Sequence, residues 1–99
     1  MDAQVVRQNL INVLREIQTL SGLACPEITG VTKPAKALEK FDSKMWPVAT
    51  GMLAGRLGIE IPNDVNIFRV KATKEPATID EAVIIVCSIA NALSLIAAE

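Results

Sequence analysis

The side chains of Asp42 and Ser43 bring a carboxylate and a hydroxyl together where a helix is expected to begin. Oxygen atoms of aspartate and serine accept hydrogen bonds from backbone N–H groups that lack a partner inside a helix, so both residues are good N-caps. The same end of a helix favours negative charge, because the unpaired N–H groups and the positive end of the helix dipole lie there. The pair is therefore suited to ordinary capping, and also to an anionic group on the Ser43 hydroxyl.

The residues that follow Ser43 predict a helix of about four turns over residues 43–57. Gly58 suits the left-handed conformation with which many helices end. Pro62 then disfavours helical geometry at Ile61 and cannot donate a hydrogen bond. This helix must position the hydroxyl, because Ser43 lies at its predicted start.

The pair Asp42-Ser43 and the run Gly58-Ile59-Glu60-Ile61-Pro62 resemble the acyl carrier protein family. The mark of that family is Asp-Ser-Leu at the start of the second helix, with Gly-x-Glu-Ile-Pro at its end. Ile61 lies 18 positions after Ser43, which is the separation expected of the family. The resemblance implies that Ser43 carries a covalently attached 4′-phosphopantetheine arm, whose terminal thiol holds an acyl group as a thioester.

The resemblance also implies partners. A phosphopantetheinyl transferase would attach the arm, and Asp42 would help to position Ser43 and the metal-bound phosphates of that transferase. Acyl-transferring or synthase enzymes of a specialised fatty-acid, lipid or polyketide-type pathway would then use the loaded carrier. The chain itself would do no bond-making, and no cluster of acid, base and nucleophile emerges from the spacing of its residues. We therefore expect a carrier and not an enzyme.

The second helix departs from the family pattern. Lys44 replaces the leucine that usually follows the serine, Val48 stands where a recognition glutamate is usual, and no Asp or Glu occurs between Lys44 and Gly58. Attraction of basic partner surfaces is therefore weak or altered, which indicates a dedicated set of partners. Met45 is expected to form an apolar platform beside the arm. The weaker candidates for contacts with the arm, the acyl chain or a partner are Lys44, Met45, Trp46, Val48 and Ile61.

Length and composition favour one small helical domain over residues 1–99. Hydrophobic residues make up 51% of the chain but aromatic residues only 3%, so the core must be mainly aliphatic. The formal net charge is −1, with ten basic and eleven acidic residues. That charge supplies no extended positive surface, and we expect no nucleic acid partner.

Metal, disulfide and membrane chemistry are not expected. The chain has no histidine, and Cys25 and Cys87 form no CxxC pair, so a metal site is not predicted. Asp2 and Arg7 interrupt any apolar run at the N-terminus, which argues against a signal peptide and favours reduced thiols in the cytoplasm. We expect a monomer.

The remaining segments predict an all-α fold: a four-helix, acyl-carrier-like bundle with a long first loop and a short third helix. Residues 3–20 predict the first helix, with an apolar stripe at helical spacing. Residues 21–42 form the loop, with a helical turn over residues 35–40. Asn63-Asp64 would cap the short third helix, and the capping box of Thr78 and Glu81 would start the fourth. The expected loop anchors are Leu23, Ile28, Val31, Leu38 and Phe41.

The fourth predicted helix runs from Ile79 towards Ala98 and is mainly apolar. It has no charged residue from Ala82 to Ala98. The run is slightly short for a membrane span, which needs about 20 apolar residues. We expect a buried helix whose distal end contacts a partner or a second copy. The alternatives to a carrier are a non-catalytic helical interaction module without the arm and, from the apolar run alone, a membrane-associated subunit.

Overall fold

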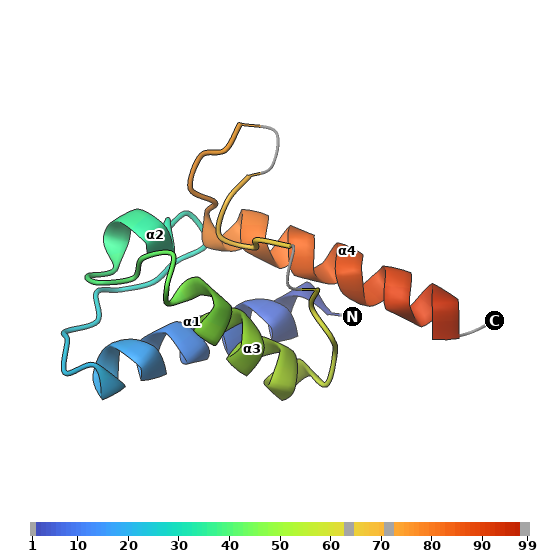
Figure 1. The fold of residues 1–99 in the computed structure, drawn as a ribbon, viewed down its shortest axis with the longest axis horizontal. Coiled ribbons are helices and arrows are strands. Elements are labelled where there is room, and N and C mark those ends of the chain that lie inside the picture. The colour runs from blue at the N-terminus through green and yellow to red at the C-terminus, as the bar shows by residue number, and fades with distance from the viewer. Residues whose placement is uncertain (1, 63–64, 71–72, 98–99) are drawn as a thin grey trace.

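The computed structural model describes residues 2–62, 65–70 and 73–97, with the side chains of the last segment described up to Asn91. In this part of the chain four helices are present: α1 (Ala3–Leu20), α2 (Pro34–Ala37), α3 (Trp46–Leu57) and α4 (Ile79–Ala97). Outside the helices, the described residues pair as strands do only at an isolated bridge between Arg69 and Pro76. The all-α prediction is confirmed at this level (Figure 1).

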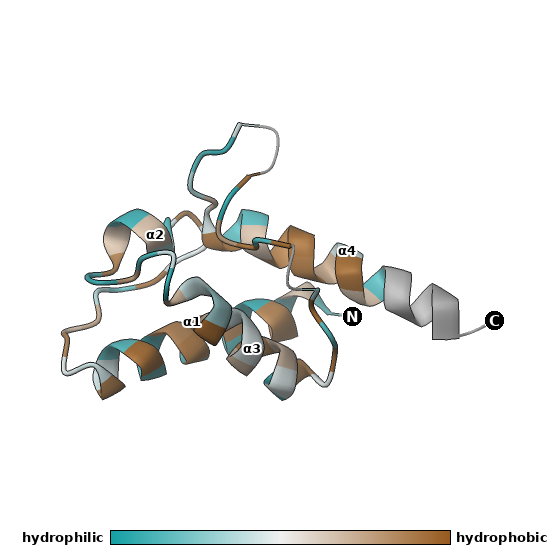
Figure 2. Ribbon diagram, in the orientation of Figure 1, coloured by the Kyte–Doolittle hydropathy of each residue, from teal (hydrophilic) through white to brown (hydrophobic). Residues whose placement is uncertain are grey.

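Helix α1 has the bounds and the cap that its sequence predicts. The Asp2 carboxylate Oδ1 accepts a hydrogen bond from the Gln4 N–H at 2.8 Å. The helix ends at Leu20, with Ser21 as its C-cap, and Gly22 follows with a left-handed φ of 72°. Brown and teal residues alternate along α1 in Figure 2, as expected of an amphipathic helix. The whole predicted apolar stripe is buried: Val6, Leu10, Val13, Leu14 and Ile17.

Helix α1 packs against both α3 and α4, so it is the central element of the fold (Figure 1). The buried side chains form one continuous cluster, which is mostly aliphatic and includes Phe41 and Phe68. Their rings meet edge to face, with centroids 5.0 Å apart. Phe41 lies in the segment before α3 and Phe68 in the segment after it, so the ring pair packs these two segments together.

The long first loop is anchored by three of the five predicted apolar residues. Ile28, Leu38 and Phe41 are buried, and Leu23 is half-buried. Val31 is 78% exposed, so the prediction that it anchors the loop is wrong. The predicted helical turn is present as α2, slightly earlier than expected. These buried apolar side chains hold the loop on the core.

Backbone and side-chain hydrogen bonds also hold this loop in place. The backbone N–H groups of Ile79 and Asp80 donate to the carbonyl oxygens of Thr32 and Gly30, each at 2.9 Å. At the other end of the loop, the buried Gln18 donates from Nε2 to the Glu39 carbonyl oxygen at 3.2 Å. The loop is therefore tied to both α4 and α1.

The predicted short third helix is not found in the residues that the structure describes after Pro62. Its expected caps, Asn63 and Asp64, lie outside them, and residues 65–70 hold a turn at Ile67 and Phe68. The Asn66 side chain Oδ1 accepts from the Phe68 N–H at 2.9 Å, a local bond that competes with helix formation. Burial of both Ile67 and Phe68 then favours the turn. The short helix of the fold is α2 instead.

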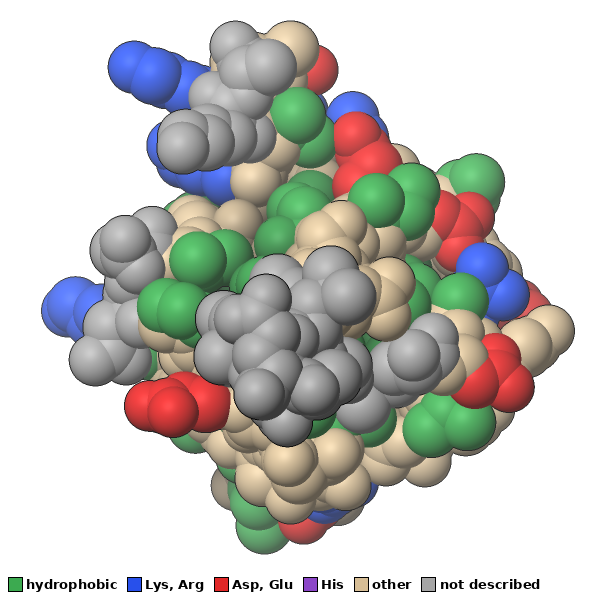
Figure 3. Space-filling view, turned by 90° about the vertical axis from the view of Figure 1, so that its right-hand side faces the viewer, with side chains coloured by type: hydrophobic (Ala, Val, Ile, Leu, Met, Phe, Trp, Pro, Cys, Tyr) green, Lys and Arg blue, Asp and Glu red, His purple; other side chains and the backbone are tan. Residues whose placement is uncertain are grey.

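Helix α4 follows its prediction closely, from Ile79 to Ala97. Within the described residues, no helix combines the length and apolarity that crossing a membrane requires. Ile84 is 65% exposed on this helix. The residues that we expected to contact a partner at its distal end lie beyond the described side chains. On the face in Figure 3, acidic and basic side chains lie interspersed around the rim.

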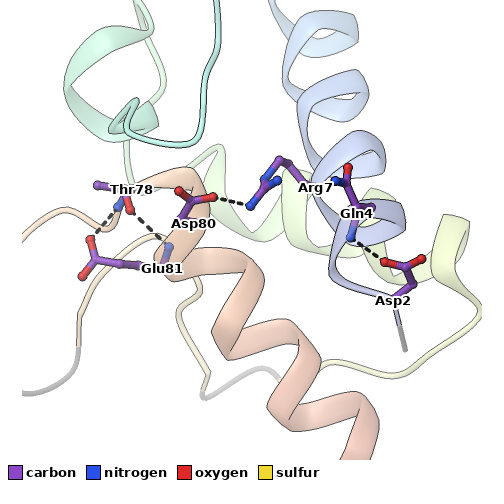
Figure 4. A network of polar contacts seen from close by, with 6 residues as sticks. All are labelled: Asp2, Gln4, Arg7, Thr78, Asp80 and Glu81. Atoms are coloured by element: carbon purple, nitrogen blue, oxygen red, sulfur yellow. Dashed lines mark hydrogen bonds and ion pairs between the residues drawn. The ribbon is translucent and has the colours of Figure 1, made fainter.

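The start of α4 is fastened by a polar network (Figure 4). The Thr78 N–H donates to Glu81 Oε1 at 2.9 Å and the Glu81 N–H donates to Thr78 Oγ1 at 3.1 Å, which confirms the predicted capping box. Arg7 of α1 donates from Nη2 to Asp80 Oδ1 at 2.7 Å. This ion pair links α1 to the first turn of α4.

Candidate functional site

A turn at Ser43, Lys44 and Met45 leads into α3. Asp42 shapes this turn, because its carboxylate Oδ1 accepts from the Lys44 N–H at 3.1 Å and its carbonyl oxygen accepts from the Met45 N–H at 2.9 Å. The helix proper begins at Trp46. The prediction that it begins near Ser43 is therefore wrong by three residues.

Pro47 explains the later start. In a helix capped by Ser43, the N–H of residue 47 would bond to the Ser43 carbonyl, and proline has no N–H. A start at Trp46 moves Pro47 into the first turn, where no N–H is needed. The other end of α3 is as predicted, with Gly58 in the left-handed conformation at φ 68°. Ser43 thus lies in the approach to α3.

The Ser43 side chain is exposed, and α3 has no side-chain cap at its N-terminus. Within the described residues, the Ser43 hydroxyl makes no hydrogen bond. The hydroxyl therefore stabilises no contact in this part of the chain. It is accessible to a modifying enzyme.

An apolar groove begins at Ser43 and follows one face of α3. The α3 residues that line it are spaced three or four apart, as expected of neighbours on one helix face. Its volume is about 260 Å³, just below the range of about 300–1,000 Å³ that is typical of small-molecule sites. The segment after α3 forms the opposite wall. The lining residues are Ser43, Trp46, Pro47, Thr50, Gly51, Ala54, Ile61, Pro62, Val65 and Asn66.

Two small residues of α3, Gly51 and Ala54, line the groove. A Cβ atom added at Gly51 would meet nothing within 4 Å, so this glycine borders open space. Thr50 lies between them and Trp46, and its hydroxyl donates to the Trp46 carbonyl oxygen at 2.8 Å. That bond satisfies the Thr50 hydroxyl within the helix. The groove wall on α3 can therefore accept an apolar ligand without leaving this hydroxyl unpaired.

A second, more open cavity of about 380 Å³ lies on the other side of Ser43 and Trp46. These two residues line both cavities, so they form the boundary between them. The second cavity differs in chemistry, because it includes two cationic side chains and one carboxylate. Its lining residues are Ala35, Leu38, Lys40, Phe41, Asp42, Ser43, Trp46 and Arg69.

Arg69 is placed over the Trp46 ring, with its guanidinium carbon 5.4 Å from the ring centroid. This distance is within the range of a cation–π contact. Trp46 is half-buried and packs against the core, and its ring centroid lies 6.5 Å from that of Phe68. The boundary between the two cavities is thus supported by the core below and covered by Arg69.

The structure brings together some of the predicted site residues and leaves others apart. Ser43, Trp46 and Ile61 line the groove, and Asp42 lines the second cavity beside Ser43. Lys44 and Val48 are exposed and line neither cavity. Met45, the expected platform, is half-buried and packs against the core, and it also lines neither.

Several lining residues were not among the predicted site residues. Gly51 carried a signal, because small residues one helical turn apart mark a surface that permits close approach. Arg69 carried a weaker one, since it belongs to a charged loop near the expected groove. Lys40, Val65 and Asn66 gave no local signal, because only the folded chain places them beside α3.

Comparisons of this chain with protein-family models, with curated proteins and with solved structures found no match.

Proposed function

We propose that this protein is an acyl carrier protein in which Ser43 bears a covalently attached 4′-phosphopantetheine arm. The observation that carries the proposal is an exposed serine hydroxyl, unbonded within the described residues, at the end of an apolar groove. The resemblance of Asp42-Ser43 and of residues 58–62 to the carrier family supports it. When attached, the arm supplies a thiol that holds an acyl group as a thioester.

The residues of the chain present and shelter this group. Asp42 fixes the turn through the Lys44 N–H, so that the Ser43 hydroxyl stays outside the helix and accessible. Trp46 and Ile61 are apolar walls of the groove, which removes part of an acyl chain from water. At about 260 Å³ the groove suits a short acyl group or the first part of a longer one.

We assign the bond-making steps to other proteins. An enzymatic serine nucleophile is activated by an adjacent base, and no basic side chain among the described residues hydrogen-bonds to the Ser43 hydroxyl. A phosphopantetheinyl transferase would attach the arm, and acyl-transferring or synthase enzymes would load and unload it. The carrier acts as a cytoplasmic monomer.

The partners are a dedicated set in a specialised fatty-acid, lipid or polyketide-type pathway. Helix α3 contains no Asp or Glu, so it offers no acidic face to attract basic partner surfaces. Lys44 and Val48 are exposed at its start instead. Partner enzymes must therefore recognise α3 by contacts other than attraction to carboxylates.

The alternative is a helical interaction module that has a carrier-like fold and no arm. It is favoured by exposed Lys44 directly after Ser43 and by the missing carboxylates of α3. In this reading the groove takes up an apolar side chain of a partner protein. The two functions differ in one simple property, the covalent state of Ser43.

Intact mass spectrometry tests the proposal directly. The chain would be co-expressed with a broad-specificity phosphopantetheinyl transferase, beside Ser43→Ala and Ser21→Ala variants. Ser21 is also exposed, so its substitution is a matched control for nonspecific modification. We expect a phosphopantetheine-sized increase in mass in the wild type and in Ser21→Ala, and none in Ser43→Ala.

A known carrier that the same transferase modifies is the positive control. If that carrier is modified and the folded wild-type chain is not, the proposal that a general transferase modifies Ser43 is contradicted. A mass increase that persists in Ser43→Ala would place the arm on another residue. The first result would favour the interaction module without an arm, whereas the second would keep a carrier and contradict only the assignment of the arm to Ser43.

A further inference from the structure

The second cavity holds two cationic side chains that come from distant parts of the sequence, Lys40 and Arg69. In the part of the chain that the structure describes, neither forms an ion pair. The cavity also contains Asp42, whose Oδ1 is engaged by the Lys44 N–H. The lining therefore has one more positive charge than negative, directly beside the Ser43 hydroxyl.

The position of Arg69 is set by its neighbours. Its backbone pairs with Pro76, and the Ala77 N–H donates to the Phe68 carbonyl oxygen at 2.9 Å. Phe68 is completely buried, so this segment is anchored to the core. The guanidinium carbon lies over the Trp46 ring, and a guanidinium carries five N–H donors in one plane. Because Arg69 lines the second cavity, those donors can form hydrogen bonds to an anion in it.

Lys40 has an unusual backbone conformation. Its φ is 58°, in the left-handed region that favours glycine and is unfavourable for a side chain with a Cβ. Residues held in such conformations cluster at functional sites. Lys74 provides a comparison within the same chain: it has a φ of 59° but does not line the cavity.

We propose that Lys40 and Arg69 form a phosphate-binding subsite, which holds the phosphodiester that would join a phosphopantetheine arm to Ser43. This inference rests on the proposed function. The phosphate would occupy the cationic cavity on one side of Trp46, and the acyl end would enter the apolar groove on the other. Holding the phosphate restricts the base of the arm and favours entry of its cargo into the groove.

Phosphorus NMR of the loaded carrier tests the subsite. The loaded wild type would be compared with Lys40→Gly, Arg69→Gln and Lys74→Gly. We expect the resonance of the Ser43 phosphodiester in Lys40→Gly and Arg69→Gln to shift towards that of a free phosphodiester and to narrow. Lys74→Gly should leave the resonance unchanged. Identical spectra for all four loaded proteins would overturn the subsite while leaving the carrier function intact.

Thermal unfolding separates a lost contact from a damaged fold. Both Lys40→Gly and Lys74→Gly place glycine at a left-handed position, so each should raise the unfolding temperature or leave it unchanged. A lost phosphate contact in Lys40→Gly without a lower unfolding temperature would support a direct role of the amine. A changed phosphorus signal in Lys74→Gly of the same size would contradict it.

Titration of the unmodified chain with inorganic phosphate distinguishes failure of the subsite from failure of the carrier function. We expect saturable shifts of the Trp46 indole and Arg69 side-chain resonances in the wild type, and at least a several-fold weaker response in Lys40→Gly. If phosphate binds there but Ser43 never accepts an arm, the site serves free phosphate and our assignment to the arm is overturned. Absence of phosphate binding together with an unmodified Ser43 overturns both proposals.

Discussion

The starts of α3 and α4 carry similar residue types and use them in opposite ways. At α4, Thr78 and Glu81 bond reciprocally, so both side chains satisfy backbone N–H groups. At α3, no side chain caps the first turn, and the Ser43 hydroxyl has no partner in the described part of the chain. A capping-type residue thus stabilises a helix only when it reaches the helix N–H groups. Left outside, its hydroxyl remains available for chemistry.

The surroundings of the two helix starts differ in the same way. The α4 start is held by the Arg7–Asp80 ion pair (Figure 4). Backbone hydrogen bonds to Gly30 and Thr32 also hold it. The α3 start borders two cavities instead. The start of α4 is closed by contacts, and the start of α3 is open to a ligand.

Gly30→Ala is expected to disturb the contacts at the start of α4. An added Cβ would lie 2.5 Å from Asp80 Oδ2 and 2.7 Å from Oδ1, so the carboxylate must shift, which disturbs its ion pair with Arg7. Because the Asp80 side chain is 47% exposed and can shift at little cost, we expect a loss of up to about 1 kcal/mol in the free energy of unfolding, the contribution of a surface ion pair. Urea denaturation would measure it.

A double-mutant cycle with Asp80→Ala is the control for this prediction. Without the carboxylate, Gly30→Ala has no clash to relieve and should cost little. Equal losses in both backgrounds would show that the close approach of Gly30 to Asp80 is not the cause.

The matched pair Thr78→Ala and Ser43→Ala tests the comparison of the helix starts directly. Thr78→Ala removes one capping bond and should cost about 1 kcal/mol of unfolding free energy. Ser43→Ala removes an exposed hydroxyl without a partner among the described residues and should stay within about 0.5 kcal/mol of the wild type. Equal costs for the two variants in urea denaturation would mean that Ser43 also acts as a cap.

A gain in stability is expected from leucine at Gly51 or Gly55, two exposed glycines one turn apart on α3. Each added Cβ would meet nothing within 4 Å, but only Gly51 lines the groove. Each variant should gain up to about 1 kcal/mol of unfolding free energy from the higher helix propensity of leucine. Their difference should appear only when an acyl group is attached.

Acyl loading should raise the unfolding temperature of the wild type and of Gly55→Leu, because the groove shelters apolar surface. In Gly51→Leu the leucine side chain fills the groove. Each methylene group of the acyl chain that it displaces should reduce the stabilisation by acyl loading by about 0.8 kcal/mol. An equal rise in all three proteins would show that the acyl group lies elsewhere.

Local patterns predicted α1 and α4 almost to the residue. Asp2 and Thr78 act through hydrogen bonds to residues two or three positions away, so the sequence window that predicts such a cap contains all of its parts. The start of α3 was predicted three residues too early, because the prediction rested on the capping pair Asp42-Ser43. The missing N–H of Pro47 excludes that earlier start. The helix predicted after Pro62 is not found in the described residues 65–70, where burial of Ile67 and Phe68 favours a turn.

The sequence by itself determined the helical class, the caps and stripe of α1, the left-handed end of α3 and the candidate hydroxyl at Ser43. Only the tertiary structure decided that this hydroxyl lies between an apolar groove and a cationic cavity. Caps and stripes follow from backbone geometry over a few residues. A cavity is formed by surfaces far apart in the chain, such as Trp46 and Arg69, and exists only once the core has packed them together.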